Sequence, residues 1–249
     1  MQIIKNFLQK NTPTIEFWTH ITGLADIEEC KPKPAKYFMP KWLKDIPSSI
    51  PIDGSYKTIK NCPVVPEFLM QGYIIPMWCD TILKVGNSSD DWSWKTSSHQ
   101  FPWEIHGDIQ FINHLPTHER NNFVFKALCP WLCKTPKGYS VYQLPLFYHF
   151  NKDFKILPGS IRTDMHFDIN QQVMVKHNSE IFIPRGTPFA WYIPYKRQKY
   201  NMTAFEETLD KKKEREISNL NLSLKFNGAY KTMAKKFDEN NKKKRINND

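Results

Sequence analysis

Short apolar segments recur between Tyr56 and Tyr195, and this recurrence restricts the fold more than any other feature of the sequence. Each segment is rich in β-branched or aromatic residues and stops at a glycine, proline, asparagine or aspartate, as strands joined by short turns do. The 17 Phe, 10 Tyr and 8 Trp residues, set against only 9 glycines, also favour strands over helical bundles. No long helical period alternates with the segments, which argues against a doubly wound parallel sheet. We therefore expect a mainly β protein whose body is a single sandwich or barrel.

The N-terminal part of the chain differs from this β-rich region. Five prolines between residues 32 and 51 prevent long helices or strands, although residues 15–21 have the pattern of one strand. A segment of this kind becomes ordered only by lying against another part of the chain, and its aromatic side chains are the expected anchors. Residues 1–55 are therefore predicted to form a proline-rich arm packed on a β-rich core domain at 56–201.

Residues 202–249 are predicted to form a helical, lysine-rich appendage. The stretch TAFEETLDKKKEREISNL begins with Thr203 as a candidate N-cap and has Glu206 three residues later, the pattern of a capping box. A second helical period follows in GAYKTMAKKFDEN, where apolar residues recur at helical spacing. These two patterns predict two helices in the appendage.

The formal net charge is +10, and it is spread along the chain. From Thr203 to Asp249 there are 12 Lys or Arg and 8 Asp or Glu, which leaves +6 on the preceding residues. Such diffuse charge suits nucleic acid as a partner and equally suits a solvated surface. The sequence also leaves open that the chain forms a homo-oligomer.

The cysteines and the apolar runs bear on the compartment. Five cysteines are an odd number without a framework spacing, which favours a reducing compartment. Cys129 and Cys133 form a CxxxC, but no second pair stands at zinc-ligand spacing, so we expect no resident metal. No apolar run approaches the roughly 20 residues of a membrane span, and the start MQIIKNFLQK lacks a signal-peptide core. We expect a cytoplasmic protein without a membrane partner.

One short stretch, CKTPKGYSVYQLP at 133–145, has the composition of an anion-binding loop. Backbone N–H groups, Lys137 and the hydroxyl of Thr135 or Ser140 are able to grip a phosphate. The alternative is an ordinary proline-led turn in which Gly138 supplies a positive φ. The same two interpretations apply to PRGTP at 184–188.

The order of these turns, and of the strands between them, resembles the later motifs of the dUTPase and dCTP deaminase superfamily, whose fold is an intertwined β-clip. The matching stretches are the TPKG loop, LPGSIRTD at 157–164 and the PRGTP turn. In that superfamily the corresponding loops hold phosphates, hold the nucleoside and its water, and precede the strand that closes the barrel. Gly72 and Tyr73, before Cys79 and Asp80, stand where its first motif does. The resemblance implies a β-clip-like body and a nucleotide ligand.

The chain departs from that superfamily where hydrolysis takes place. Arg162 stands at the position of the water-activating aspartate and Met165 at that of the stacking tyrosine, so only Asp164 remains of the acids of this turn. An arginine cannot accept a proton from water. The resemblance therefore implies binding without efficient hydrolysis.

The whole chain also resembles a family of phage-encoded proteins of unassigned function. The shared blocks are CP…GY…PxWxD, TPKGYS, LPG…D and PRGTP…PYKR. This resemblance implies a phage protein in the cytoplasm of a host cell, and it implies no activity.

Two other functions stay open. His166 and Asp168 form an HxD, the start of a 2-His-1-carboxylate iron site as in Fe(II)/2-oxoglutarate oxygenases, with Arg185 or Arg197 as the 2-oxoglutarate ligand. His177, however, follows too soon after this pair to close such a site. The other alternative is a non-enzymatic structural or assembly protein that uses aromatic-rich loops, such as the one around Trp92, Trp94 and Trp103, to hold a partner.

The leading hypothesis is a shallow pocket that binds an anionic, nucleotide-like ligand without efficient hydrolysis, and it assigns no cofactor. Glycine turns let the backbone approach such a ligand, and nearby cations supply charge-assisted hydrogen bonds. The expected ligand-binding residues are Thr135, Lys137, Gly138, Ser140, Asp164, Arg185, Gly186 and Arg197.

Overall fold

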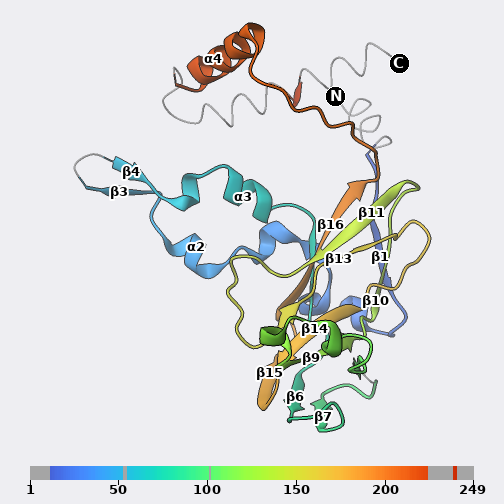
Figure 1. Cartoon of the computed structure of the whole chain (residues 1–249). Coiled ribbons are helices and arrows are strands. Elements are labelled where there is room, and N and C mark those ends of the chain that lie inside the picture. Colours follow the sequence, from blue (N-terminus) through green and yellow to red (C-terminus); the bar gives the residue numbers. More distant parts are fainter. Residues whose placement is uncertain (1–11, 53–54, 101, 224–237, 240–249) are drawn as a thin grey trace. The chain divides into compact units, whose positions relative to one another are not determined.

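The computed structural model describes residues 12–52, 55–100, 102–223 and 238–239 (Figure 1). The chain divides into two compact units. The first contains residues 12–46 and 68–198, and the second contains residues 47–67 and those that follow 198. Strands dominate the first unit, so the expected mainly β class is confirmed.

Among the described residues, the strands of the first unit form four antiparallel sheets. The largest has the order β13-β11-β16-β5-β2, and the others have the orders β12-β14-β9-β8, β15-β6-β7 and β1-β10. The strand β16 is the longest and pairs with both β11 and β5. The strands are β1 Glu16–Thr19, β2 Lys33–Pro34, β5 Tyr73–Pro76, β6 Thr81–Val85, β7 Trp92–Thr96, β8 Trp103–Ile105, β9 Asn122–Ala127, β10 Trp131–Lys134, β11 Tyr139–Leu144, β12 Lys155–Ile156, β13 Gly159–Ile161, β14 Gln171–Lys176, β15 Ser179–Ile183 and β16 Pro188–Lys196.

One apolar cluster forms the core of this unit and draws on all the larger sheets. Alternation along β11 turns Val141 and Gln143 inward and Tyr142 outward, as the period-2 pattern predicts. Gln143 is buried although it is polar, because its side chain accepts a hydrogen bond from the hydroxyl of Tyr192 at 3.0 Å. The single proton of that hydroxyl is shared with the carbonyl of Ile169, 2.8 Å away, and the hydroxyl oxygen accepts from the Gln171 amide at 2.8 Å. A satisfied polar network of this kind avoids the cost of burying unpaired groups.

The proline-rich segment up to Ile46 belongs to the first unit. Its β1 pairs with β10, and β2 extends the largest sheet by pairing with β5. The indole of Trp131 donates to the carbonyl of Cys30 at 3.0 Å, which ties the segment to the core. The prolines leave room only for short helices, which are η1 Leu24–Asp26, η2 Glu28–Cys30, η3 Ala35–Phe38 and α2 Lys41–Asp45; η5 Ile112–His114 and η6 Thr117–Glu119 lie further along the chain.

The second unit contains a hairpin, β3 (Ser49–Pro51) paired with β4 (Ser55–Lys57), followed by η4 (Ile59–Asn61) and the start of α3 (Val64–Leu69). Asn61 donates from its side-chain amide to the carbonyl of Ser48 at 2.6 Å, which holds the chain ends of the hairpin together.

The helix α4 (Leu209–Ser223) also lies in the second unit. It begins later than the expected start at Thr203, because the hydroxyl of Thr208, not that of Thr203, accepts the N–H of Lys211 at 3.3 Å. The second expected helix, GAYKTMAKKFDEN, lies almost entirely outside the described residues. No helix in the described part of the chain is both long and apolar enough to cross a bilayer.

Candidate functional site

The TPKG stretch forms a proline-led turn. The N–H of Tyr139 donates to the carbonyl of Pro136 at 3.0 Å, and Gly138 has a φ of 86°. Only glycine adopts such a φ without strain. The turn leads directly into β11, as the structural interpretation of the sequence predicts.

Asp164 and Arg197 close this turn from the other side. Asp164 Oδ2 accepts the N–H of Gly138 at 3.0 Å, and both carboxylate oxygens accept hydrogen bonds from the Arg197 guanidinium. Arg197 donates further to the carbonyl of Tyr139 at 2.5 Å and to Ser140 Oγ at 2.7 Å. The Asp164 side chain is only 9% exposed. The hydrogen bonds from Arg197 and Gly138 lower the pKa of this carboxyl from 3.8 to about 2.

Thr135 and Lys137 lie at the same turn and differ in exposure. Thr135 is buried, and its hydroxyl lies 2.8 Å from that of Thr163. Lys137 lies at the tip of the turn and is exposed. The structure thus brings together six of the eight expected ligand-binding residues, which are Thr135, Lys137, Gly138, Ser140, Asp164 and Arg197.

Arg185 and Gly186 lie at the opposite end of β16. This strand has nine residues, so its ends are roughly 26 Å apart at about 3.3 Å per residue. There Arg185 forms an ion pair with Glu29 at 3.0 Å, and its N–H donates to Asp80 at 2.8 Å. Gly186, with a φ of 81°, packs against the Glu29 side chain. The structure therefore separates the two turns that the sequence hypothesis placed around one pocket, and a ligand role for these residues stays a prediction.

The residues of the alternative iron site do not assemble either. His166 Nε2 and Asp168 Oδ2 are 3.8 Å apart, and both side chains are exposed. His177 instead stacks on Phe123, with ring centroids 4.1 Å apart. Within the described residues, no group of three His, Cys, Asp or Glu side chains is arranged to hold a metal ion.

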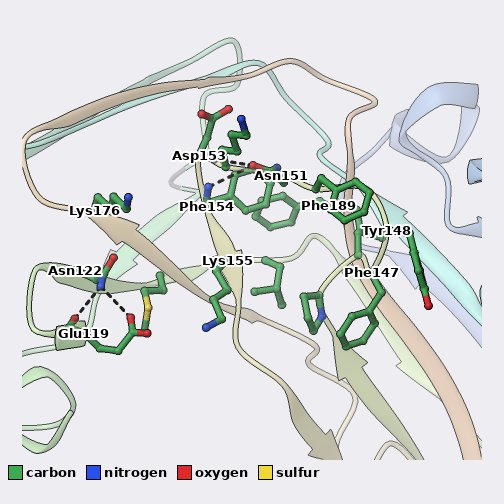
Figure 2. Close-up of a pocket in the computed structure, with 16 residues that line it drawn as sticks. Glu119, Asn122, Phe147, Tyr148, Asn151, Asp153, Phe154, Lys155, Lys176 and Phe189 are labelled. Carbon is green, nitrogen blue, oxygen red and sulfur yellow. Dashed lines mark hydrogen bonds between the residues drawn. The ribbon is translucent and has the colours of Figure 1, made fainter. Parts of the chain in front are cut away.

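A pocket of about 480 Å³ opens elsewhere in the first unit, beneath the loop at 145–153 (Figure 2). The loop joins β11 to β12 and begins at Pro145, which has no N–H with which to continue a strand ladder. The floor of the pocket comes from β12 and β14, through side chains such as Ile156 and Met174. The loop between β11 and β12 forms a wall of the pocket, and a contact from α2 holds its backbone in place.

Trp42, from α2, holds this loop. Its indole donates to the carbonyl of Tyr148 at 2.6 Å, and its ring lies 5.6 Å from that of Phe150. His149, between these two residues, is half-buried, and burial lowers the pKa of its imidazole.

Tyr148 and Phe150 have left-handed backbone conformations, with φ of 65° and 53°. Bulky residues avoid this region because Cβ clashes with the backbone. Such conformations persist only where surrounding contacts enforce them, and they concentrate at ligand clamps and active sites. Both residues line the pocket.

The pocket has an aromatic side and a charged side. Figure 2 shows Phe147 and Tyr148 on one side, and Lys176, Glu119 and Asn122 on the other, with Lys155 between them. Glu119 is partly engaged, because its carboxylate accepts a hydrogen bond from the Asn122 amide at 3.2 Å.

Three lysines line the pocket against two acids, Glu119 and Asp153. Among the residues that the structure describes, the amines of Lys152, Lys155 and Lys176 have no carboxylate within ion-pair distance. Unpaired cations in a concave site attract anions more strongly than cations on a convex surface do.

The sequence hypothesis did not include this pocket. The stretch YSVYQLPLFYHF at 139–150 has the composition of one strand, whereas the structure ends β11 at Leu144. A signal was present, because four aromatic residues and one lysine fall between Pro145 and the next strand, which itself begins with a lysine. Such a concentration in a loop is typical of a binding segment.

No protein-family model and no curated protein sequence matches this chain. Among solved structures, the chain is similar to dUTPase variants of Staphylococcus bacteriophage 80alpha. One, solved with dUpNHpp, is 12% identical with a TM-score of 0.36 over 79% of this chain and 99% of that one. Another is 11% identical with a TM-score of 0.37 over the same shares. A dUTPase variant from phage phi11 of S. aureus is 9% identical with a TM-score of 0.34, again over 79% and 99%. At these TM-scores the likeness assigns neither a site nor a reaction to this chain.

Proposed function

We propose that this protein binds an anionic ligand with an aromatic ring, of the nucleotide class, in the pocket beneath the loop at 145–153. The observation that carries the proposal is the combination, in one hollow, of aromatic walls with lysines that have no partner in the described part of the chain. The volume, about 480 Å³, lies within the roughly 300–1,000 Å³ typical of small-molecule pockets.

The aromatic side of the pocket suits a base or another flat ring. Phe147 and Tyr148 present ring faces and edges there (Figure 2). Aromatic contacts of this kind are worth about 0.5–1.5 kcal/mol beyond the apolar area that they bury. The backbone strain at Tyr148 indicates that the fold enforces the position of this ring before a ligand arrives.

The charged side suits a phosphate or a similar anion. Lys155 and Lys176 come from neighbouring strands, β12 and β14, and both are exposed at the pocket. Lys152, in the loop, adds a third amine. A charge-assisted hydrogen bond contributes about 1.5–3 kcal/mol. Two such contacts and one ring contact therefore total about 3.5–7.5 kcal/mol, so we expect a Kd between about 1 μM and 1 mM.

The proposal is one of binding without efficient hydrolysis. Asp164, the one acid that remains in the turn at 157–164, closes the turn before β11, whereas the pocket lies beneath the loop after β11. Its oxygens accept hydrogen bonds from Arg197 and Gly138. With a pKa of about 2, it is a poor proton acceptor for water.

Calorimetry and thermal-shift measurements with dUTP, UTP, ATP, uridine and inorganic triphosphate test the proposal. A ligand at a hundredfold its Kd should stabilise the protein by about 2.7 kcal/mol. We expect the three nucleoside triphosphates to bind more tightly than uridine or inorganic triphosphate. Only the nucleoside triphosphates reach both the aromatic side and the charged side of the pocket. The double variant Lys155→Ala/Lys176→Ala should bind them at least tenfold more weakly.

Lys95→Ala is the matched control, since Lys95 is an exposed strand lysine that does not line the pocket. It should bind as the unmodified protein does. Equal affinity for the double variant and the unmodified protein would exclude this pocket as the site. Steady release of phosphate or pyrophosphate from a bound triphosphate would show that the protein is a hydrolase.

A further inference from the structure

A pair of tyrosines forms an aromatic surface on the largest sheet, away from the pocket. The rings of Tyr142, in β11, and Tyr195, in β16, stack with centroids 4.0 Å apart and planes at 10°. The Tyr195 hydroxyl lies 2.7 Å from Ser160 Oγ, in β13, which fixes that ring on the sheet. Tyr142 is 43% exposed, which is high for a ring already covered on one side by a stacking partner.

The position of the pair follows from the strand register. Tyr142 lies opposite Ile193 on one side and Ser160 on the other, while Ser140 lies opposite Tyr195. Residues at these positions share the outward face of the sheet, because their neighbours Val141 and Gln143 are buried in the core. The pair, called the platform below, thus lies on the outward face of the largest sheet, with Tyr142 exposed and Tyr195 half-buried.

The charge around the platform is positive. The three strands β11, β13 and β16 contain no Asp or Glu. Arg162 directly follows β13 and is exposed, and it is close enough to Asp164 to help lower the pKa of that carboxyl. Asp164 is itself neutralised by Arg197. Lys137 is exposed in the turn that precedes β11, the strand of Tyr142.

From this arrangement we infer that the platform of Tyr142 and Tyr195, with Arg162 and Lys137 beside it, binds single-stranded nucleic acid. Exposed aromatic rings on a sheet face provide stacking surfaces for unpaired bases, and every base has a face that stacks. Cations beside such rings contact the phosphates that connect the bases. A duplex does not fit this chemistry, because its bases are already stacked on each other.

The inference is independent of the pocket beneath the loop at 145–153, and the two are tested apart. Fluorescence anisotropy with labelled 12-nucleotide oligo-dT, oligo-U and a 12-base-pair DNA duplex, at 50 to 200 mM salt, measures the binding. We expect both single strands to bind more tightly than the duplex. The relative affinity for oligo-dT and oligo-U shows whether DNA or RNA is preferred.

Variants of the platform make the test specific. Tyr142→Ala should weaken oligonucleotide binding by about tenfold, as expected when one stacking surface is lost, whereas Tyr142→Phe keeps the ring and should bind normally. Arg162→Ala should reduce the slope of log affinity against log salt by about 0.7, the value for one phosphate contact in a single strand.

Two controls separate this site from other aromatic and basic groups. Tyr37→Ala removes an exposed tyrosine that already has a lysine amine 5.1 Å from its ring centroid, and it should bind as the unmodified protein does. Lys155→Ala/Lys176→Ala should also bind oligonucleotides normally, even if it no longer binds a nucleotide. Unchanged affinity in Tyr142→Ala, or tighter binding of the duplex than of the single strands, would overturn the inference.

Discussion

The turn at 136–139 and the loop at 145–153 flank the same strand, β11, and differ in how their polar groups are used. At the turn, the carboxylate of Asp164 accepts hydrogen bonds from both Arg197 and Gly138. In the loop and the strands beneath it, the lysines have no carboxylate partner in the described part of the chain. The turn has its positive φ at a glycine, which adopts it without strain, whereas the loop has positive φ at Tyr148 and Phe150.

This difference indicates which region is structural and which is able to bind. A charged group that is already paired inside the fold has little interaction left for a ligand, and breaking the pair costs free energy. An unpaired cation at a pocket has its interaction still available. The backbone strain at Tyr148 and Phe150 also indicates a binding role for the loop. If these positions served only to turn the chain, glycine would adopt the same φ without strain. The comparison therefore predicts stability effects at the turn and binding effects at the loop.

The largest expected effect on stability comes from the buried hydroxyl pair behind the turn. Thr163→Val should lower the free energy of unfolding by about 1–2 kcal/mol, because it removes the 2.8 Å hydrogen bond between the two buried hydroxyls and leaves Thr135 with only the carbonyl of Tyr139, at 3.3 Å. The double variant Thr135→Val/Thr163→Val should lose less than the sum of the single variants, since both hydroxyls are then removed. Urea denaturation measures all three, and additive losses would show that the pair is not coupled.

Acid should remove a smaller contribution from the same region. The pKa of Asp164 is lowered in the folded protein from 3.8 to about 2, so its ionised form stabilises the fold. That contribution is complete above pH 4 and is lost as the pH falls towards 2. The difference in melting temperature between the unmodified protein and Asp164→Asn should therefore be constant above pH 4 and shrink below it. A difference that does not vary between pH 5 and pH 2 would contradict the assignment of this pKa to Asp164.

The smallest expected effect, at the loop, has the opposite sign. Phe150 is 68% exposed and has a φ of 53°, and asparagine tolerates this conformation better than phenylalanine does. Phe150→Asn should therefore raise the free energy of unfolding by up to about 1 kcal/mol, less the contribution of the lost ring contact with Trp42, and weaken ligand binding in the pocket. Phe182→Asn is the control, because Phe182 is 58% exposed but lies in the ordinary strand β15. Stabilisation of both variants alike would show that the loop is not strained.

Much of the fold could be predicted from local patterns. Stretches such as YSVYQL and QQVMVK are rich in β-branched or aromatic residues and lie between turn residues, and this composition identified them as strands. The start of α4 was misplaced, since Thr203 and Thr208 are both acceptable caps and only the structure shows that Thr208 is used. The segment before Ile46 was expected to be an arm, and its strand pairings show that it completes the sheets of the first unit.

The sequence by itself determined the mainly β class, the short elements between prolines and the turn at Gly138, because these depend on backbone geometry within a few residues. Only the tertiary structure decided which charged groups and aromatic rings are already paired within the fold and which are able to contact a ligand. Asp164 and Arg197 are 33 residues apart, and Trp42 and Tyr148 are 106 apart. Pairing over such separations depends on how the strands are ordered in the sheets, and this order is not written in any local pattern. The antiparallel pairing of β11 with β16 placed the TPKG turn beside Arg197, at the end of β16 opposite Arg185, so two similar turns in the sequence became two separate places in the fold.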